Sequence, residues 1–166
     1  TDKLRLKCVR QSFSERIINL NLISKIMAKQ IFVNLPVKDL KKSIDFFTKL
    51  GFRFNLQFTD ENATCMIIGK DMFAMLLVEK FFRTFIKKGI CDAKKSTEVL
   101  IALSVGSRKE VDRLTGMALK AGGKEPRKPQ DHGWMYGRAF EDLDGHIWEV
   151  FHMDEGKMPK EMKEKK

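Results

Sequence analysis

The amino-acid sequence predicts an α+β fold built from two tandem units, each with the element order βαβββ. The first observation is that strand-like and helix-like apolar patterns alternate in the same order in both halves of the chain. The second is an internal repeat, because FVNLPVKD matches LIALSVGS at an offset of 68 residues and FAMLLV matches IWEVFH at an offset of 74. With 166 residues, 43% hydrophobic and 33% charged, the chain has the size and composition of one globular domain.

The first unit is expected at residues 27–79. Asp39 is a predicted N-cap for an amphipathic helix, and Gly51 is expected to end that helix because glycine tolerates the left-handed backbone of a C-terminal cap. Turn-forming residues separate the apolar runs that follow. The predicted elements are a strand at 31–37, a helix at 40–50 and strands at 52–59, 63–69 and 71–79.

The second unit is expected at residues 98–154. Ser107 is its predicted helix N-cap, and two consecutive glycines are expected to end that helix. Asp142 and Asp144 are interpreted as residues of a hairpin turn, because two carboxylates alone lack the further oxygen ligands of a calcium loop. The predicted elements are a strand at 99–105, a helix at 108–121, a proline-marked edge segment at 124–129 and strands at 134–140 and 146–153.

Three segments lie outside these units. Residues 1–26 are expected to be an N-terminal extension outside the core, with an amphipathic docking helix as the alternative, and a cleaner pattern begins at Met27. Residues 80–97 form the linker, whose phenylalanines either pack against the units or cover a substrate as a lid. Residues 155–166 are expected to be a charged C-terminal tail.

The formal net charge of +10 suggests a polyanionic partner until its distribution is considered. Residues 1–26 carry a net +4 and residues 155–166 a net +2, so the predicted domain between them carries only +4. We therefore expect no nucleic-acid partner. No apolar run is long enough to span a membrane, and no membrane partner is expected.

The three cysteines are Cys8, Cys65 and Cys91. Their number is odd and their spacing matches no CxxC or Cys/His metal motif. They are interpreted as free thiols in a reducing compartment. This interpretation, together with the lack of a signal-peptide pattern near the start, predicts a cytoplasmic protein.

The paired βαβββ pattern resembles the vicinal oxygen chelate superfamily, which includes glyoxalases, bleomycin resistance proteins and extradiol dioxygenases. The resemblance covers residues 28–154, and the matching stretches look like a branch of predicted lactoylglutathione lyase-like proteins. It implies a curved mixed sheet around a cleft, and dimerisation in many members. The stretches that carry it are FVNLPVKDLKKSIDFFTKLGF, NLQFTDENATCMII, EVLIALSVGSRKEVD and WMYGRAFEDLDGHIWEV.

The resemblance also implies four metal-ligand positions, on the first and last strands of each unit. In this chain they are Phe32, Met75, Leu100 and Glu149. Phenylalanine and leucine have no donor atom, and a thioether is too soft for a hard or borderline divalent cation. Only Glu149 matches, so we expect no metal cofactor, with a divalent metal on unconventional ligands as the alternative.

Strand alternation predicts which side chains share the cleft with Glu149, the candidate catalytic residue. Asn34 is expected on the same cleft wall. Trp134, Tyr136 and Arg138 form one row on their strand, and this row enters the cleft if the hairpin pairs Arg138 with Glu149. Arg138 would then either neutralise Glu149 or bind a ligand oxygen, while the aromatic rings stack on the ligand.

The predicted function is binding of a small organic molecule in an aromatic cleft whose usual metal site is largely lost. The alternative is a metal-dependent lyase, isomerase or dioxygenase of the same superfamily that uses Glu149. The sequence leaves open whether the protein is an enzyme. Its expected partners are a small-molecule ligand and a second copy of the chain in a homodimer.

Overall fold

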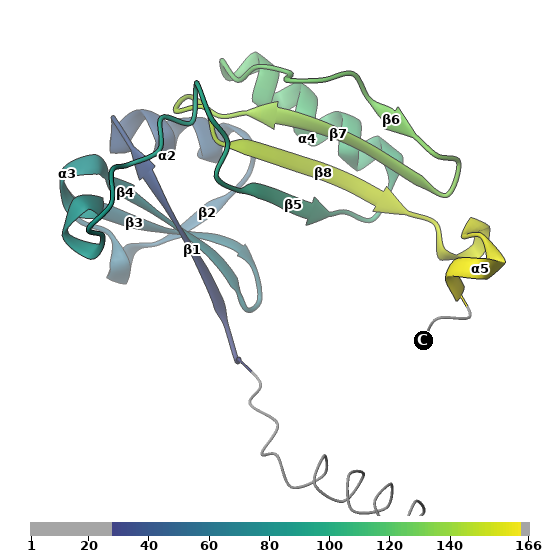
Figure 1. The fold of residues 1–166 in the computed structure, drawn as a ribbon, viewed down its shortest axis with the longest axis horizontal. Helices are drawn as coiled ribbons and strands as arrows, with labels where there is room; N and C mark the ends of the chain where they lie inside the picture. Colours follow the sequence, from purple (N-terminus) through teal and green to yellow (C-terminus); the bar gives the residue numbers. More distant parts are fainter. Residues whose placement is uncertain (1–27, 164–166) are drawn as a thin grey trace, which may run out of the picture.

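The computed structural model describes residues 28–163 and contains the first βαβββ unit at the left of Figure 1. Its four strands form one mixed sheet, sheet 1, in the order β1-β4-β3-β2, in which β1 runs parallel to β4 and the other pairs are antiparallel. The elements are β1 Ile31–Val37, α2 Leu40–Lys49, β2 Arg53–Asn55, β3 Ala63–Gly69 and β4 Met72–Val78.

The second unit repeats this topology in sheet 2, with the strand order β5-β8-β7-β6 and a parallel β5–β8 pair. The predicted α+β class with two tandem βαβββ units is therefore confirmed, and each unit forms its own four-stranded sheet. The elements are β5 Leu100–Ser104, α4 Arg108–Lys120, β6 Gln130–Asp131, β7 Met135–Glu141 and β8 Ile147–Met153.

The two long helices begin at the predicted caps. The carboxylate of Asp39 accepts the Lys42 amide hydrogen at 3.1 Å, and the hydroxyl of Ser107 accepts the Glu110 amide hydrogen at 3.2 Å. Gly51 follows α2 with a φ of 93°, in the region that favours glycine. Local sequence signals therefore determine where these helices begin and where α2 ends.

Shorter elements lie between and after the units. The linker contains α3 Glu79–Phe82 and a 3₁₀ turn at Arg83–Phe85, and β8 is followed by a 3₁₀ turn at Glu155–Lys157 and α5 Lys160–Lys163. The predicted extension at residues 1–26 lies outside the described residues. Within residues 28–163, no helix is both long enough and apolar enough to cross a membrane.

The predicted strand at 52–59 and the predicted edge segment at 124–129 contain less strand than expected. Residues 52–59 form only β2, followed by a 3₁₀ turn at Leu56–Phe58, because the Asn55 side chain accepts the Gln57 amide hydrogen and caps that turn. Residues 124–129 contribute one isolated bridge, between Lys124 and Glu141. Prolines at 126 and 129 supply no amide hydrogen for a longer ladder.

One hydrophobic core joins the two units through their helix-covered faces. Phe47 of α2 meets Trp148 of β8 with ring centroids 5.1 Å apart, and Phe46 meets Phe140 at 6.2 Å. Because this shared core occupies one face of each sheet, the opposite faces lie on the outside of the chain. We call these the outer faces of sheet 1 and sheet 2.

The hairpin at residues 142–146 fastens the second unit to the first. The buried Asp142 carboxylate accepts the backbone amide hydrogens of Asp144, Gly145 and His146, and the Trp148 indole hydrogen at 3.0 Å. Burial raises the pKa of Asp142, while the nearby His146 acts to lower it. The predicted hairpin role is thus the observed one.

Two side chains of the same hairpin reach across to unit 1. Asp144 accepts the Lys38 amide hydrogen at 3.0 Å and the Ser43 hydroxyl at 3.3 Å, and the His146 ring bonds the Pro36 carbonyl at 2.8 Å. The hairpin therefore holds the end of β1 and the start of α2 against sheet 2.

Candidate functional site

Glu149 lies on the outer face of sheet 2, in the middle of β8. Its neighbours across the sheet are Ala102 on β5 and Ala139 on β7, and Phe151 follows it on the same face. Ala102 leaves space above the sheet, and a pocket of about 240 Å³ opens there, lined also by Gly137 and Arg138. Apolar walls formed by Phe151 and Met135 surround a single carboxylate.

Arg127 is the partner of this carboxylate. Its Nη2 donates a short hydrogen bond to Glu149 Oε1 and forms an ion pair with it, at side-chain exposures of 41% for Arg127 and 23% for Glu149. The pocket therefore holds a guanidinium beside a carboxylate, so its net charge is close to neutral while both charged groups face the opening.

The sequence did not single out Arg127, because it lies between two prolines in a segment without a strand pattern. The sequence nevertheless contained a signal that could have pointed to Arg127. The segment at 124–129 was predicted to run along the edge of the sheet that carries Glu149, and Arg127 is the arginine of that segment. Assigning the partner required the path of the loop across the sheet, which periodicity does not give.

The condition on which the aromatic row would enter the cleft, a pairing of Arg138 with Glu149, is not met. The hairpin register pairs Glu149 with Ala139, so Arg138 lies opposite Val150 on the other face of the sheet, toward α4. One residue of register reverses the face on which a strand side chain lies. Arg138 instead donates to Glu125 at 2.7 Å and 3.0 Å and to Asp112 at 3.2 Å.

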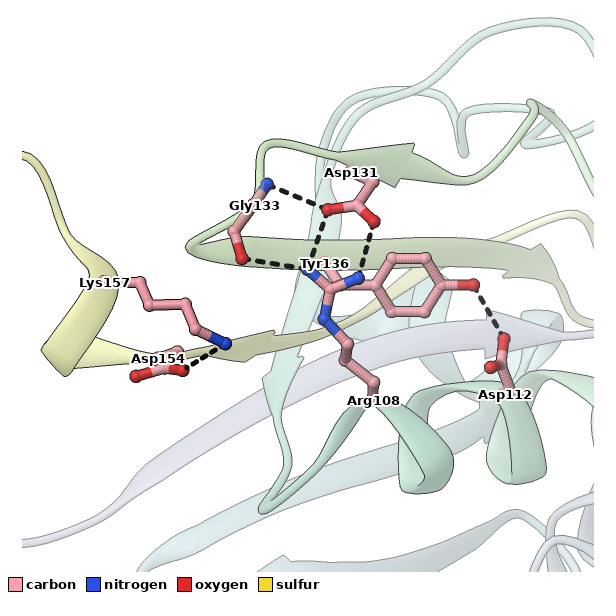
Figure 2. Close-up of polar contacts among 7 residues, drawn as sticks. All are labelled: Arg108, Asp112, Asp131, Gly133, Tyr136, Asp154 and Lys157. Carbon is pink, nitrogen blue, oxygen red and sulfur yellow. Dashed lines mark hydrogen bonds and ion pairs between the residues drawn. The ribbon is translucent and has the colours of Figure 1, made fainter.

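Tyr136 shares the α4 side of β7 with Arg138. Its hydroxyl donates to Asp112 on α4 at 2.8 Å, and the Arg108 guanidinium lies over its ring at 5.0 Å from the centroid (Figure 2). Burial raises the pKa of Tyr136, and the Asp112 hydrogen bond raises it further. Tyr136 therefore packs against a helix rather than beside Glu149.

The remaining two predicted ligand-binding residues are also apart from Glu149. Trp134 precedes β7, is half-buried, and accepts the Asp154 amide hydrogen through its carbonyl at 2.7 Å. Asn34 lies on the outer face of sheet 1 and lines a separate cavity of about 260 Å³ between the units, with Phe82 of the linker and His146. Of the five predicted site residues, Glu149 and Arg138 line this pocket, and strand alternation places only the Glu149 side chain on the outer face of sheet 2.

Three comparisons with known proteins bear on the fold. A family model described as "Bleomycin resistance protein-like N-terminal" matches residues 29–69. The solved structure of a hypothetical protein from S. aureus is 30% identical, with a TM-score of 0.66 over 77% of this chain and 96% of that protein. A glyoxalase/bleomycin resistance protein/dioxygenase from Nocardioides is 20% identical, with a TM-score of 0.65 over 88% and 97% of the two chains.

The chain belongs to the glyoxalase/bleomycin resistance/dioxygenase superfamily. A superfamily enzyme from Burkholderia phytofirmans PsJN shares the fold at 16% identity, with a TM-score of 0.63 over 76% of this chain and 99% of that enzyme. No curated protein matches the chain. The resemblance identified from the sequence is therefore confirmed at the level of the superfamily.

The four positions that the superfamily resemblance assigns to metal ligands have the chemistry expected from the sequence. Phe32 stacks on Phe73 at 4.8 Å between centroids, and Leu100 is 49% exposed on the edge strand β5. Glu149 is already paired with a cation. Within residues 28–163, no three His, Cys, Asp or Glu residues lie close enough together to hold a metal ion, so this donor set does not fit one.

Proposed function

We propose that this superfamily member binds a small organic molecule in the pocket on the outer face of sheet 2, with Arg127 and Glu149 as its polar contacts. The observation that carries the proposal is the Arg127–Glu149 ion pair beside Phe151, at the opening of a pocket of about 240 Å³. Binding sites of this kind combine apolar walls with a few convergent polar groups.

The pair offers both kinds of hydrogen bond to a ligand. Arg127 uses Nη2 on Glu149, which leaves Nε and Nη1 to donate to a carboxylate or carbonyl oxygen. Glu149 Oε2 accepts from a ligand hydroxyl or amine. A matching ligand carries an oxygen acceptor next to a donor, with an apolar part that packs on Phe151 and Met135.

A catalytic role for Glu149 would use the same geometry. As a general base, Glu149 would remove a proton from a ligand donor group that lies within reach of its Oε2. Arg127 would stabilise negative charge that develops on the neighbouring ligand oxygen. Binding is the simpler proposal, because it requires only a guanidinium, a carboxylate and an apolar wall beside them.

The metal-dependent alternative is a lyase, isomerase or dioxygenase built on Glu149. It requires further ligands, and Phe32, Met75 and Leu100 supply no carboxylate or imidazole. Metal analysis of the purified protein tests it. Stoichiometric Ni, Zn, Fe or Mn that is lost in Glu149→Ala would support the alternative and contradict the binding proposal as stated.

We also propose that two copies of the chain associate through the free edges of their sheets. Strands β1 and β5 are edge strands, and they expose Ile31 at 57%, Phe32 at 48% and Leu100 at 49%. An exposed apolar edge pairs readily with another chain. Sedimentation velocity should give a dimer that Leu100→Lys weakens, and a monomeric wild type at all concentrations would contradict this.

Mandelate is a suitable probe for the pocket, because it combines a carboxylate, an adjacent hydroxyl and a phenyl ring. Phenylacetate lacks only the hydroxyl. Titrations followed by backbone amide shifts should move Ala102, Gly137 and Phe151, which surround the pocket. Arg127→Met should weaken mandelate about tenfold, the equivalent of about 1.4 kcal/mol, while Glu149→Gln should reduce the preference for mandelate over phenylacetate.

The control is Arg113→Met, which removes an exposed arginine of α4 whose guanidinium contacts Met117. It should leave mandelate binding unchanged. Equal binding by wild type and Arg127→Met, or shifts confined to residues outside sheet 2, would contradict the proposed function.

A further inference from the structure

Arg127 reaches Glu149 from a segment with little backbone support. This segment lies between the isolated Lys124–Glu141 bridge and β6, which is two residues long. It contains prolines at positions 126 and 129, which donate no amide hydrogens. Backbone pairing alone therefore fixes the segment only at its two ends.

Side chains hold one end of the segment at Asp131. Arg108 of α4 donates to both carboxylate oxygens of Asp131, at 2.5 Å and 2.7 Å, and to the Gly133 carbonyl at 2.9 Å (Figure 2). Asp131 also accepts the Gly133 amide hydrogen at 2.8 Å. These bonds, with Arg108 contributing most, lower the pKa of Asp131 to about 2.

The other end is held at Glu125 by Arg138. Arg138 is 17% exposed and bonds Glu125 through Nε and Nη2, and it also reaches Asp112 on α4. Burial acts to lower the pKa of Arg138, but its bonds to Glu125 and Asp112 outweigh burial and raise it. Asp112 further accepts the Tyr136 hydroxyl, and Arg108 lies over the Tyr136 ring, so these contacts link the two ends of the segment.

These contacts form one network on the α4 side of sheet 2, while Arg127 lies on the outer side. We call the network the charged clamp. Its members are Arg108, Asp112, Glu125, Asp131, Tyr136 and Arg138.

We propose that the charged clamp positions Arg127 over Glu149, with Arg108 and Arg138 as positioning residues for the pocket. This inference rests on the proposed function, because it assigns the clamp to the same pocket. It also gives Tyr136 a role at a distance from the ligand, and it gives Arg138, which lines the pocket, a role that acts through Glu125.

The physical argument is that a long side chain on a loosely held loop samples many positions, and ordering it costs conformational entropy. A forked guanidinium on a carboxylate fixes both distance and orientation, which a lysine cannot do. Two such anchors, at Glu125 and Asp131, bracket Arg127 and restrict where its backbone lies. The pocket thereby receives a pre-organised cation.

The order of the Arg127 side chain is the direct test, because it requires no ligand. The order parameter of the Arg127 Nε–Hε group, from ¹⁵N relaxation, should be high in the wild type. In the double variant Glu125→Gln/Asp131→Asn it should fall below about 0.6, the range of flexible groups. Urea unfolding of each variant checks that the protein is folded.

A milder variant keeps the inference testable if the double variant fails to fold. Arg108→Lys retains the charge but loses the fork, so it should lower the Arg127 order parameter to an intermediate value. The matched control is Lys157→Ala, which breaks the exposed Lys157–Asp154 pair seen in Figure 2 without touching the clamp. It should leave Arg127 unchanged.

Mandelate titration then connects the clamp to binding. The double variant should bind mandelate about tenfold more weakly than the wild type, close to the effect of Arg127→Met. An unchanged Arg127 order parameter in both the double variant and Arg108→Lys would overturn the positioning inference even if mandelate binds. Loss of order in a protein that never binds mandelate would contradict the proposed function and leave the positioning of Arg127 supported.

Discussion

The two βαβββ units share one topology but differ in how the chain reaches the outermost strand. In unit 1, three residues separate α2 from β2, whereas in unit 2 nine residues separate α4 from β6. The short connection packs tightly, since the Phe52 amide donates to the Phe47 carbonyl at 3.0 Å. The long connection passes along the edge of sheet 2 and carries Arg127 to the pocket.

The outer faces differ in chemistry as a result. Met75 of sheet 1 corresponds to Glu149 of sheet 2. Its partner on the parallel strand is Asn34, whereas the partner of Glu149 is Ala102. The uncharged side chains of sheet 1 need no counter-charge. The Glu149 carboxylate of sheet 2 is stabilised by a nearby cation. A repeated fold thus carries a polar pocket in the unit whose connection is long enough to supply that cation.

The largest effect is expected where the units are fastened together. Asp142→Ala should lower the free energy of unfolding by at least about 3 kcal/mol, because it leaves the Asp144 and His146 amides and the Trp148 indole N–H without their acceptor, while the Gly145 amide keeps only the residue 142 carbonyl. Urea denaturation measures this. A loss below about 1 kcal/mol would mean that the hairpin holds its shape without the carboxylate.

The second prediction places a carboxylate in unit 1 at the equivalent position. Met75→Glu introduces a charge without an arginine opposite it, so it should destabilise the protein by about 1–3 kcal/mol. Met75→Gln is the matched control and should cost less, because an amide carries no net charge. Equal losses for the two variants would show that the missing cation is not the cause.

The third prediction removes the carboxylate from unit 2. Glu149→Met makes sheet 2 resemble sheet 1 and breaks an ion pair whose two side chains are partly exposed. Such pairs contribute about 0–1 kcal/mol, so the free energy of unfolding should change by less than about 1 kcal/mol. A much larger loss in urea denaturation would indicate that the pair is a structural element rather than a binding group.

The smallest effect is a pH dependence at the charged clamp. The pKa of Asp131 is about 2 in the folded protein, against an ordinary value of 3.8, so the ionised form stabilises the fold above about pH 4. This contribution is lost as the pH falls toward about 2. The difference in unfolding free energy between wild type and Asp131→Asn should therefore shrink over that range, and a constant difference would contradict the assigned pairing.

Much of the fold could be predicted from the sequence, because the signals are local. Asp39, Ser107 and Gly51 mark helix ends through their own backbone and side-chain preferences, and the repeat of FVNLPVKD in LIALSVGS indicates the second unit. Glu149 and Phe151 lie two residues apart on one strand, and the alternation of strand side chains is enough to place them on one face.

The partner of Glu149 could not be predicted, because it depends on register and on the path of a loop. Alternation determines which residues share a face within one strand, but a shift of one residue between β7 and β8 moves Arg138 to the other side. The proline-flanked segment that carries Arg127 has no periodicity to interpret. The strand register and the path of this segment both depend on tertiary structure, which local sequence patterns do not determine.

A crystal structure of the protein soaked with mandelate is the most direct test of the central claim. The account predicts mandelate on the outer face of sheet 2, with its carboxylate on Arg127, its hydroxyl on Glu149 and its ring against Phe151. Mandelate bound in the cavity beside Asn34, or a sheet 2 pocket that stays empty at saturating mandelate, would contradict it.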